Sequence, residues 1–175
     1  MPGPPAALLA PWHEVFTLLG AAAATLIGAM FVVVSLGVGV LTRDRIVSVR
    51  AFLTSTVAHL STMLFGCAVC LTPALDWQWL TAAAGLAGAA GAGYSGWVLV
   101  GFRQHPSTVA SDWWWYAILP LLIYLALLAS AGAAWRAAPT TIEAVAALLA
   151  LMLVIGIRNA WDMVVFLVLR AGDSE

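Results

Sequence analysis

Three polar residues near the C-terminus, Arg158, Asn159 and Asp162, interrupt an apolar segment that covers residues 141–169. Arg158 and Asp162 are spaced at i,i+4, where two side chains meet on one face of a helix, so we expect an ion pair. Ionisable side chains inside a long apolar segment are costly unless paired, and they often mark a pathway for ions or protons. Counted back from Arg170, Asp162 and Arg158 lie about 12 and 18 Å from the end of the segment.

Other apolar segments place polar residues about 12 to 18 Å from the corresponding end. These residues are His59, Tyr94, Ser95, Tyr124 and Ser35. Pro120 belongs with them, because a proline lacks the backbone donor that would bond the carbonyl of Tyr116. We therefore expect one intramembrane polar layer to which every helix contributes.

The polar layer has two interpretations. In the structural interpretation, a buried ion pair and hydrogen-bonding residues fix which helices meet and at what register. In the functional interpretation, the chain is a small cation or proton channel or transporter. Asp162 and His59 would then form a proton-handling or cation-coordinating pair whose pKa values Arg158 sets.

Two cysteines and three histidines could also carry chemistry. Cys67 and Cys70 resemble the thiol pair of disulfide-forming quinone reductases, so a thiol redox protein is a further alternative. The chain has no second cysteine pair to pass electrons on, and a regular helix strains a disulfide at this spacing, so we expect packing residues. His13, His59 and His105 fall at three different depths, so we expect neither a metal site nor a haem.

The remaining composition excludes several classes of function. No nucleophile with a base, metal cluster or phosphate-binding loop can be assembled, so we expect neither an enzyme nor a cofactor. The seven basic residues are all Arg and the net charge is −1, which argues against a nucleic-acid partner. Hydrophobic residues make up 63% of the chain and charged residues only 9%. This composition is typical of a protein whose solvent is the lipid bilayer.

The elements that must position these residues are apolar segments long enough to cross a bilayer core of about 30 Å as helices. They cover residues 15–41, 51–72, 80–102, 113–134 and 141–169. All prolines except Pro120 lie outside these segments, as regular helices require. The sequence therefore predicts an all-α bundle of five transmembrane helices and a single transmembrane domain covering residues 1–175.

The arginines predict how this bundle is oriented, because basic residues near span ends are retained in the cytoplasm. Five of them share one side: Arg43, Arg45, Arg50, Arg103 and Arg170. Only Arg136 lies near a span end on the other side. We therefore expect the N-terminus outside the cytoplasm and the C-terminus inside.

Small residues recur every four positions on two of the predicted spans. They are Gly20, Ala24 and Gly28 on the first span and Gly88, Ala92 and Gly96 on the third. In lipid, close approach of backbones supplies much of the contact between helices, so we expect these two spans to meet inside the bundle. Homo-oligomerisation through the same residues is an alternative. An accessory or assembly subunit that binds another membrane protein would also suit a chain with very short loops.

Two motifs carry a resemblance to a known family. Residues 20–28 read Gly-Ala-Ala-Ala-Ala-Thr-Leu-Ile-Gly, and residues 158–162 read Arg-Asn-Ala-Trp-Asp. Both motifs resemble an uncharacterised family of small bacterial inner-membrane proteins. The resemblance implies a multi-pass protein of the bacterial inner membrane and carries no activity with it.

Overall fold

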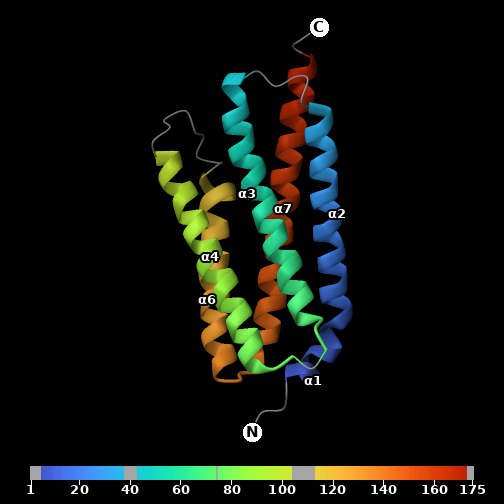
Figure 1. Cartoon of the computed structure of the whole chain (residues 1–175), viewed down its shortest axis with the longest axis vertical. Coiled ribbons are helices and arrows are strands. Elements are labelled where there is room, and N and C mark those ends of the chain that lie inside the picture. Colours follow the sequence, from blue (N-terminus) through green and yellow to red (C-terminus); the bar gives the residue numbers. More distant parts are fainter. Residues whose placement is uncertain (1–4, 38–42, 74, 104–112, 173–175) are drawn as a thin grey trace.

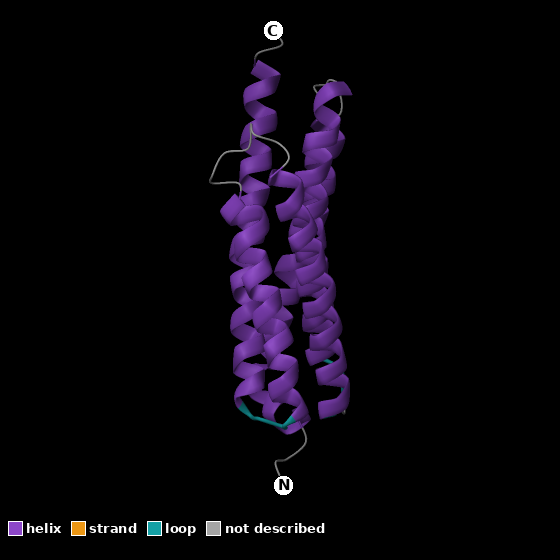
Figure 2. Cartoon of the chain, turned by 90° about the vertical axis from the view of Figure 1, so that its left-hand side faces the viewer, coloured by secondary structure: helices purple, strands orange, loops and turns teal. Residues whose placement is uncertain are grey.

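The structure of the chain is a computed structural model, which describes residues 5–37, 43–73, 75–103 and 113–172. Within these residues the long elements are all helices, and Figure 2 draws no strand among them. Five helices are long and apolar enough to cross a membrane. The predicted number of spans is therefore confirmed, and the chain has the architecture of a multi-pass membrane protein.

The first three spans are α2 (His13–Gly37), α3 (Arg43–Cys70) and α4 (Trp77–Arg103). The fourth consists of η2 (Trp114–Ile118) and α6 (Leu119–Trp135), and the fifth is α7 (Thr140–Gly172). Two short elements, α1 (Pro5–Leu9) and η1 (Ala10–Trp12), precede α2. The helices run side by side, and the first and last described residues lie at opposite ends of the bundle, as an odd number of spans requires (Figure 1).

Helix lengths differ from the lengths of the apolar segments. α3 begins at Arg43 rather than at residue 51, and α7 continues to Gly172 rather than ending at residue 169. Arginine favours helices almost as strongly as leucine does, so a charged segment extends a helix after its apolar part has ended. At the C-terminal end of the bundle, α2, α3 and α7 extend beyond α4 and η2 (Figure 1). Residues 38–41 of the predicted first span lie outside the described residues.

Apolar side chains fill the interior and also cover the outside of the bundle. Phe16, Leu60 and Met63 are fully buried. Large apolar side chains are nevertheless exposed on several helices, among them Leu18, Leu86, Trp97, Leu122 and Leu151. A bundle that is apolar on both sides suits a lipid environment, because lipid tails are as apolar as the core.

The two sets of small residues do not face each other. α2 packs against α3 and α7, whereas α4 packs mainly against α6, on the other side of the bundle (Figure 1). A Cβ atom at Gly20 would lie 3.3 Å from the Cβ atom of Cys67, and one at Gly88 would lie 2.7 Å from the backbone nitrogen of Leu128. The prediction that the first and third spans meet is therefore wrong. A small residue permits close approach but does not determine which helix approaches.

The turn between α6 and α7 contains the one non-glycine residue with positive φ in the described chain, Ala137 at 53°. Its N–H donates to the carbonyl of Ala134 at 2.8 Å, and the N–H of Ala138 donates to that of Ala133 at 3.1 Å. These two bonds form a Schellman motif, whose left-handed position is usually glycine. An alanine there costs on the order of 1 kcal/mol.

Candidate functional site

A hydrogen-bonded cluster around His59 lies inside the bundle. The Nε2 atom is 3.1 Å from the hydroxyl of Ser55, and Nδ1 is 2.9 Å from the hydroxyl of Tyr124 on α6. The Tyr124 hydroxyl donates to the hydroxyl of Thr62 at 3.3 Å. The ring of Tyr94 on α4 meets the imidazole edge-on, with 6.2 Å between ring centroids. We call these five residues the His59 cluster, and it joins three helices.

The hydrogen bonds of the His59 cluster run in one direction. The Thr62 hydroxyl donates to the carbonyl of Ala58 at 3.0 Å, so it accepts from Tyr124. Tyr124 in turn accepts from Nδ1 of His59, which leaves Nε2 to accept from Ser55. A neutral imidazole with its proton on Nδ1 therefore satisfies each of these groups. The chain of donors ends on a backbone carbonyl, as expected for a cluster that holds helices together.

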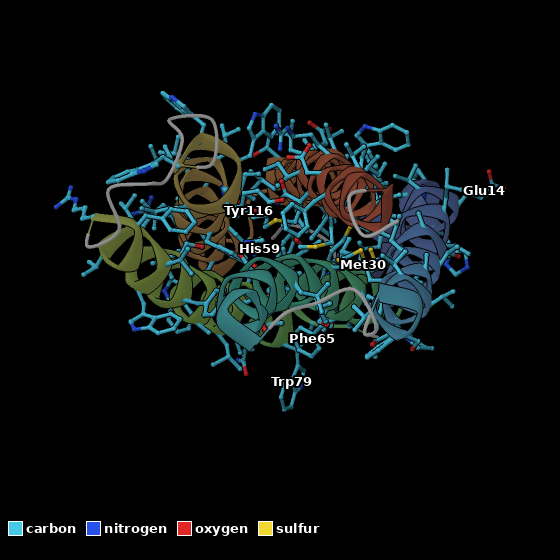
Figure 3. The ribbon with its side chains drawn as sticks, turned by 90° about the horizontal axis from the view of Figure 1, so that it is seen from above. Glu14, Met30, His59, Phe65, Trp79 and Tyr116 are labelled. Atoms are coloured by element: carbon cyan, nitrogen blue, oxygen red, sulfur yellow. The ribbon has the colours of Figure 1, made fainter. Side chains whose placement is uncertain are left out.

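A second polar cluster joins α7 to η2. Arg158 forms the expected ion pair with Asp162, and its guanidinium carbon lies 4.8 Å from the ring centroid of Trp115. The side-chain amide of Asn159 donates to the carbonyl of Trp115 at 3.3 Å, and the Tyr116 hydroxyl donates to the carbonyl of Asn159 at 3.4 Å. We call Trp115, Tyr116, Arg158, Asn159 and Asp162 the Arg158 cluster. Figure 3 shows Tyr116 and His59 among the helices and Glu14 and Trp79 at the periphery.

Pro120 explains why the carbonyl of Trp115 accepts a bond from another helix. The η2 segment is a π-helical turn, in which an N–H group bonds the carbonyl five residues earlier. In this register the donor for the carbonyl of Trp115 would be residue 120, and proline has no N–H. From the sequence we expected the carbonyl of Tyr116 to be free, because in a regular α-helix residue 120 would bond the carbonyl four residues earlier. The π turn moves the available acceptor by one residue.

The two clusters bond different parts of the fourth span. The His59 cluster includes Tyr124 of α6, whereas the Arg158 cluster includes Trp115 and Tyr116 of η2. They are close neighbours on α3 and α7, because a Cβ atom at Gly156 would lie 2.6 Å from the Cδ2 atom of Leu60. Arg158 also lies over Trp115, which belongs to the first turn of the fourth span.

The structure places the remaining residues of the predicted layer apart from one another. Ser35 is exposed, and its hydroxyl donates to the carbonyl of Phe31 in the same helix at 2.8 Å. Ser95 is buried, and its hydroxyl has no hydrogen-bond partner among the described residues. His59 has hydroxyl partners instead of Asp162. The residues expected to form one layer thus divide into two hydrogen-bonded clusters, and Ser35 and Ser95 belong to neither.

The other candidate residues occupy simpler surroundings. Cys67 and Cys70 are buried free thiols. Among the described residues, no three His, Cys, Asp or Glu side chains gather in a way that could hold a metal ion. A small apolar cavity of about 20 Å³ lies among α3, α4, α6 and α7, with Thr62 and Leu149 in its lining. This volume holds about one water molecule, which is too little for a substrate.

Sequence reasoning missed Ser55, Thr62, Trp115 and Tyr116 as members of the clusters. A signal existed for the first two, because they lie four residues before and three residues after His59, on the same helix face. The other two depend on the π turn, which the position of Pro120 alone does not reveal.

Comparison of the chain with known protein families, with characterised proteins and with solved structures finds no match. The fold therefore defines only the general class, a bundle with five helices able to span a membrane. The resemblance of the motifs at residues 20–28 and 158–162 to a bacterial family stays a prediction. Any more specific function must be argued from the geometry.

Proposed function

We propose that this protein is a non-catalytic accessory subunit of the bacterial inner membrane, with its N-terminus outside the cytoplasm, that binds another membrane protein through α2. The observation that supports this proposal is the exposure of small residues on α2. Thr17, Ala21, Ala24, Gly28 and Ser35 are all exposed, and no atom lies within 4 Å of where a Cβ atom of Gly28 would be. We call these five residues the α2 face.

The spacing of the α2 face suits contact with a further helix. From Thr17 to Gly28 its residues alternate at four and three positions, and Ser35 follows seven positions later, which is the period of two helices that cross at about 20°. Lipid offers no reason for small side chains, whereas a second helix gains close backbone contact from them. The hydroxyls of Thr17 and Ser35 donate to carbonyls of their own helix, so the face presents no unpaired donor to a partner.

The closed interior supports a non-catalytic role. The hydroxyl and imidazole groups that link Ser55, His59, Tyr124 and Thr62 bond one another and end on a backbone carbonyl, and the cavity beside Thr62 holds about one water molecule. A channel needs a continuous row of water or exchangeable groups across the bilayer, which the described side chains do not offer. Binding of a partner therefore explains more of the geometry than transport does.

The size of the complex in mildly solubilised membranes tests this proposal. The wild-type chain should migrate well above its own mass of 18.3 kDa, and Gly28→Leu should shift it towards the monomer. Gly132→Leu is the matched control, because Gly132 of α6 is also exposed with no atom within 4 Å. It should leave the complex intact.

Three results would contradict the proposal. One is a wild-type chain that migrates as a monomer, and another is an equal effect of Gly28→Leu and Gly132→Leu. The third is co-purification of two differently tagged copies with no other protein present, which would assign the α2 face to a homo-oligomer.

A further inference from the structure

The Arg158 cluster has an edge that the protein does not cover. The side chains of Arg158 and Asp162 are 29% and 36% exposed, whereas Asn159 is only 1% exposed. Trp161 of α7 and Trp114 of η2 are exposed beside this edge, at 66% and 53%. A cation and a carboxylate are thus partly exposed on a helix that also exposes an indole ring three residues after Arg158.

This edge lies where lipid headgroups are expected. The apolar span of α7 runs from Thr140 to Phe166, and Arg158 and Asp162 lie among its last nine residues. Exposed tryptophans such as Trp161 and Trp114 also prefer the boundary between lipid tails and headgroups. The partner of the ion pair at this level is therefore a polar headgroup rather than a lipid tail.

We propose that this edge binds the headgroup of a phosphatidylethanolamine molecule, with the phosphate at Arg158 and the ammonium at Asp162. A guanidinium binds phosphate oxygens in a planar, charge-assisted arrangement, and a carboxylate accepts hydrogen bonds from a primary ammonium. An anionic headgroup would meet repulsion from Asp162. A quaternary ammonium has no N–H to donate to it. A headgroup with a phosphate and a primary ammonium matches both charges.

The surface of α7 below the ion pair suits an acyl chain. Leu151, Val154 and Ile157 are exposed at 54%, 56% and 50%. Leu151 and Val154 lie seven and four residues before Arg158, on its side of α7, and Ile157 lies four residues before Trp161. They continue from the ion pair towards Thr140, which is the direction of the bilayer interior. A lipid molecule could thus occupy both the ion pair and this apolar strip, whereas free phosphoethanolamine would leave the strip unused.

Buried contacts hold the edge in place before a lipid binds. The bond from Asn159 to the carbonyl of Trp115 fixes η2 against α7, and the ring of Trp115 packs against the guanidinium of Arg158. A binding site whose charges are already positioned loses little conformational entropy on binding. This site lies on α7 and η2, so the inference does not depend on a partner at the α2 face.

Native mass spectrometry of the delipidated full chain tests the site. The probes are phosphatidylethanolamine, phosphatidylcholine and phosphatidylglycerol with identical acyl chains, titrated separately. We expect phosphatidylethanolamine to bind about tenfold more tightly than the other two, the effect of one charge-assisted hydrogen bond. Equal binding of the three lipids by the wild-type chain would overturn the inference without any variant.

Two variants test which side chain binds the phosphate and which binds the ammonium. Asp162→Asn should lower the affinity for phosphatidylethanolamine about tenfold and raise that for phosphatidylglycerol, whereas Arg158→Gln should weaken all three. Arg103→Gln is the matched control, because Arg103 is an exposed arginine at the same end of the bundle, and it should change nothing. Unchanged selectivity in Asp162→Asn would refute the role of the carboxylate.

A soluble competitor separates a lipid site from a site for a free headgroup. Glycerophosphoethanolamine should displace the lipid only at a concentration at least a hundredfold higher, because it lacks the acyl chains that would contact α7. Displacement at equal concentration would show that the site recognises the free headgroup, and the lipid inference would be wrong.

Discussion

Replacing Gly88 with alanine should weaken the contact between α4 and α6. A Cβ atom at this position of α4 would lie 2.7 Å from the backbone nitrogen of Leu128 and 2.9 Å from its Cα atom. These are backbone atoms of α6, so no side-chain rotation can relieve the overlap. The two helices would have to separate along their shared interface.

The expected loss of stability can be set against matched controls on the same helix. Overpacking of this kind costs about 1 to 3 kcal/mol, and separation of a whole helix pair belongs at the upper end. Gly93→Ala and Gly96→Ala introduce the same methyl group where no atom lies within 4 Å. They should raise the free energy of unfolding by at most about 1 kcal/mol, because alanine favours a helix more than glycine does.

Unfolding in detergent, followed by circular dichroism, measures the difference between the variants. Gly88→Ala should unfold at a lower temperature or denaturant concentration than the wild type, and Gly93→Ala and Gly96→Ala should not. If Gly88→Ala were as stable as Gly93→Ala, α4 and α6 could not be packed as closely as the structure has them, and the reasoning would fail.

Three further predictions concern the turn, the His59 cluster and the orientation. Ala137→Gly should stabilise the chain by about 1 kcal/mol because it removes the left-handed strain, and Ala138→Gly should not; equal effects in thermal unfolding would contradict this. A double-mutant cycle of His59→Leu and Tyr124→Phe should give a coupling of about 1 kcal/mol, whereas additive losses would mean that the two side chains do not interact. A reporter fused to the C-terminus should be cytoplasmic and one fused before the first span external, and both on one side would exclude five spans.

The architecture was largely predictable because long apolar segments separated by charged residues have few other interpretations in lipid. The limits of the helices were less predictable. Arg43 belongs to α3 although it lies outside the apolar segment, because hydropathy reports the lipid boundary and not the end of the hydrogen-bonded helix. The choice of partner was not predictable either, since Gly88 allows close approach by any helix, and only the structure shows that Leu128 of α6 lies there.

The candidate site was predictable only where it depends on local spacing. The ion pair of Arg158 and Asp162 follows from their i,i+4 separation. The contact of Arg158 with Trp115 does not follow from spacing, because it depends on how η2 lies against α7. The partner of His59 was also hidden, since nothing in the local sequence links it to Tyr124 of α6. Contacts between distant segments require the relative rotation of whole helices, which hydropathy does not specify.

The π turn of η2 has a consequence for insertions and deletions. A π turn contains one residue more than the α-helical turn that would replace it, so losing one residue from 114–118 would restore a regular helix and leave α6 unchanged from Leu119 onward. Losing a residue elsewhere in a span would rotate one part of the helix by about 100° against the other and turn buried side chains towards lipid. Homologous chains that differ in length by one residue within the fourth span should therefore carry the gap at this turn.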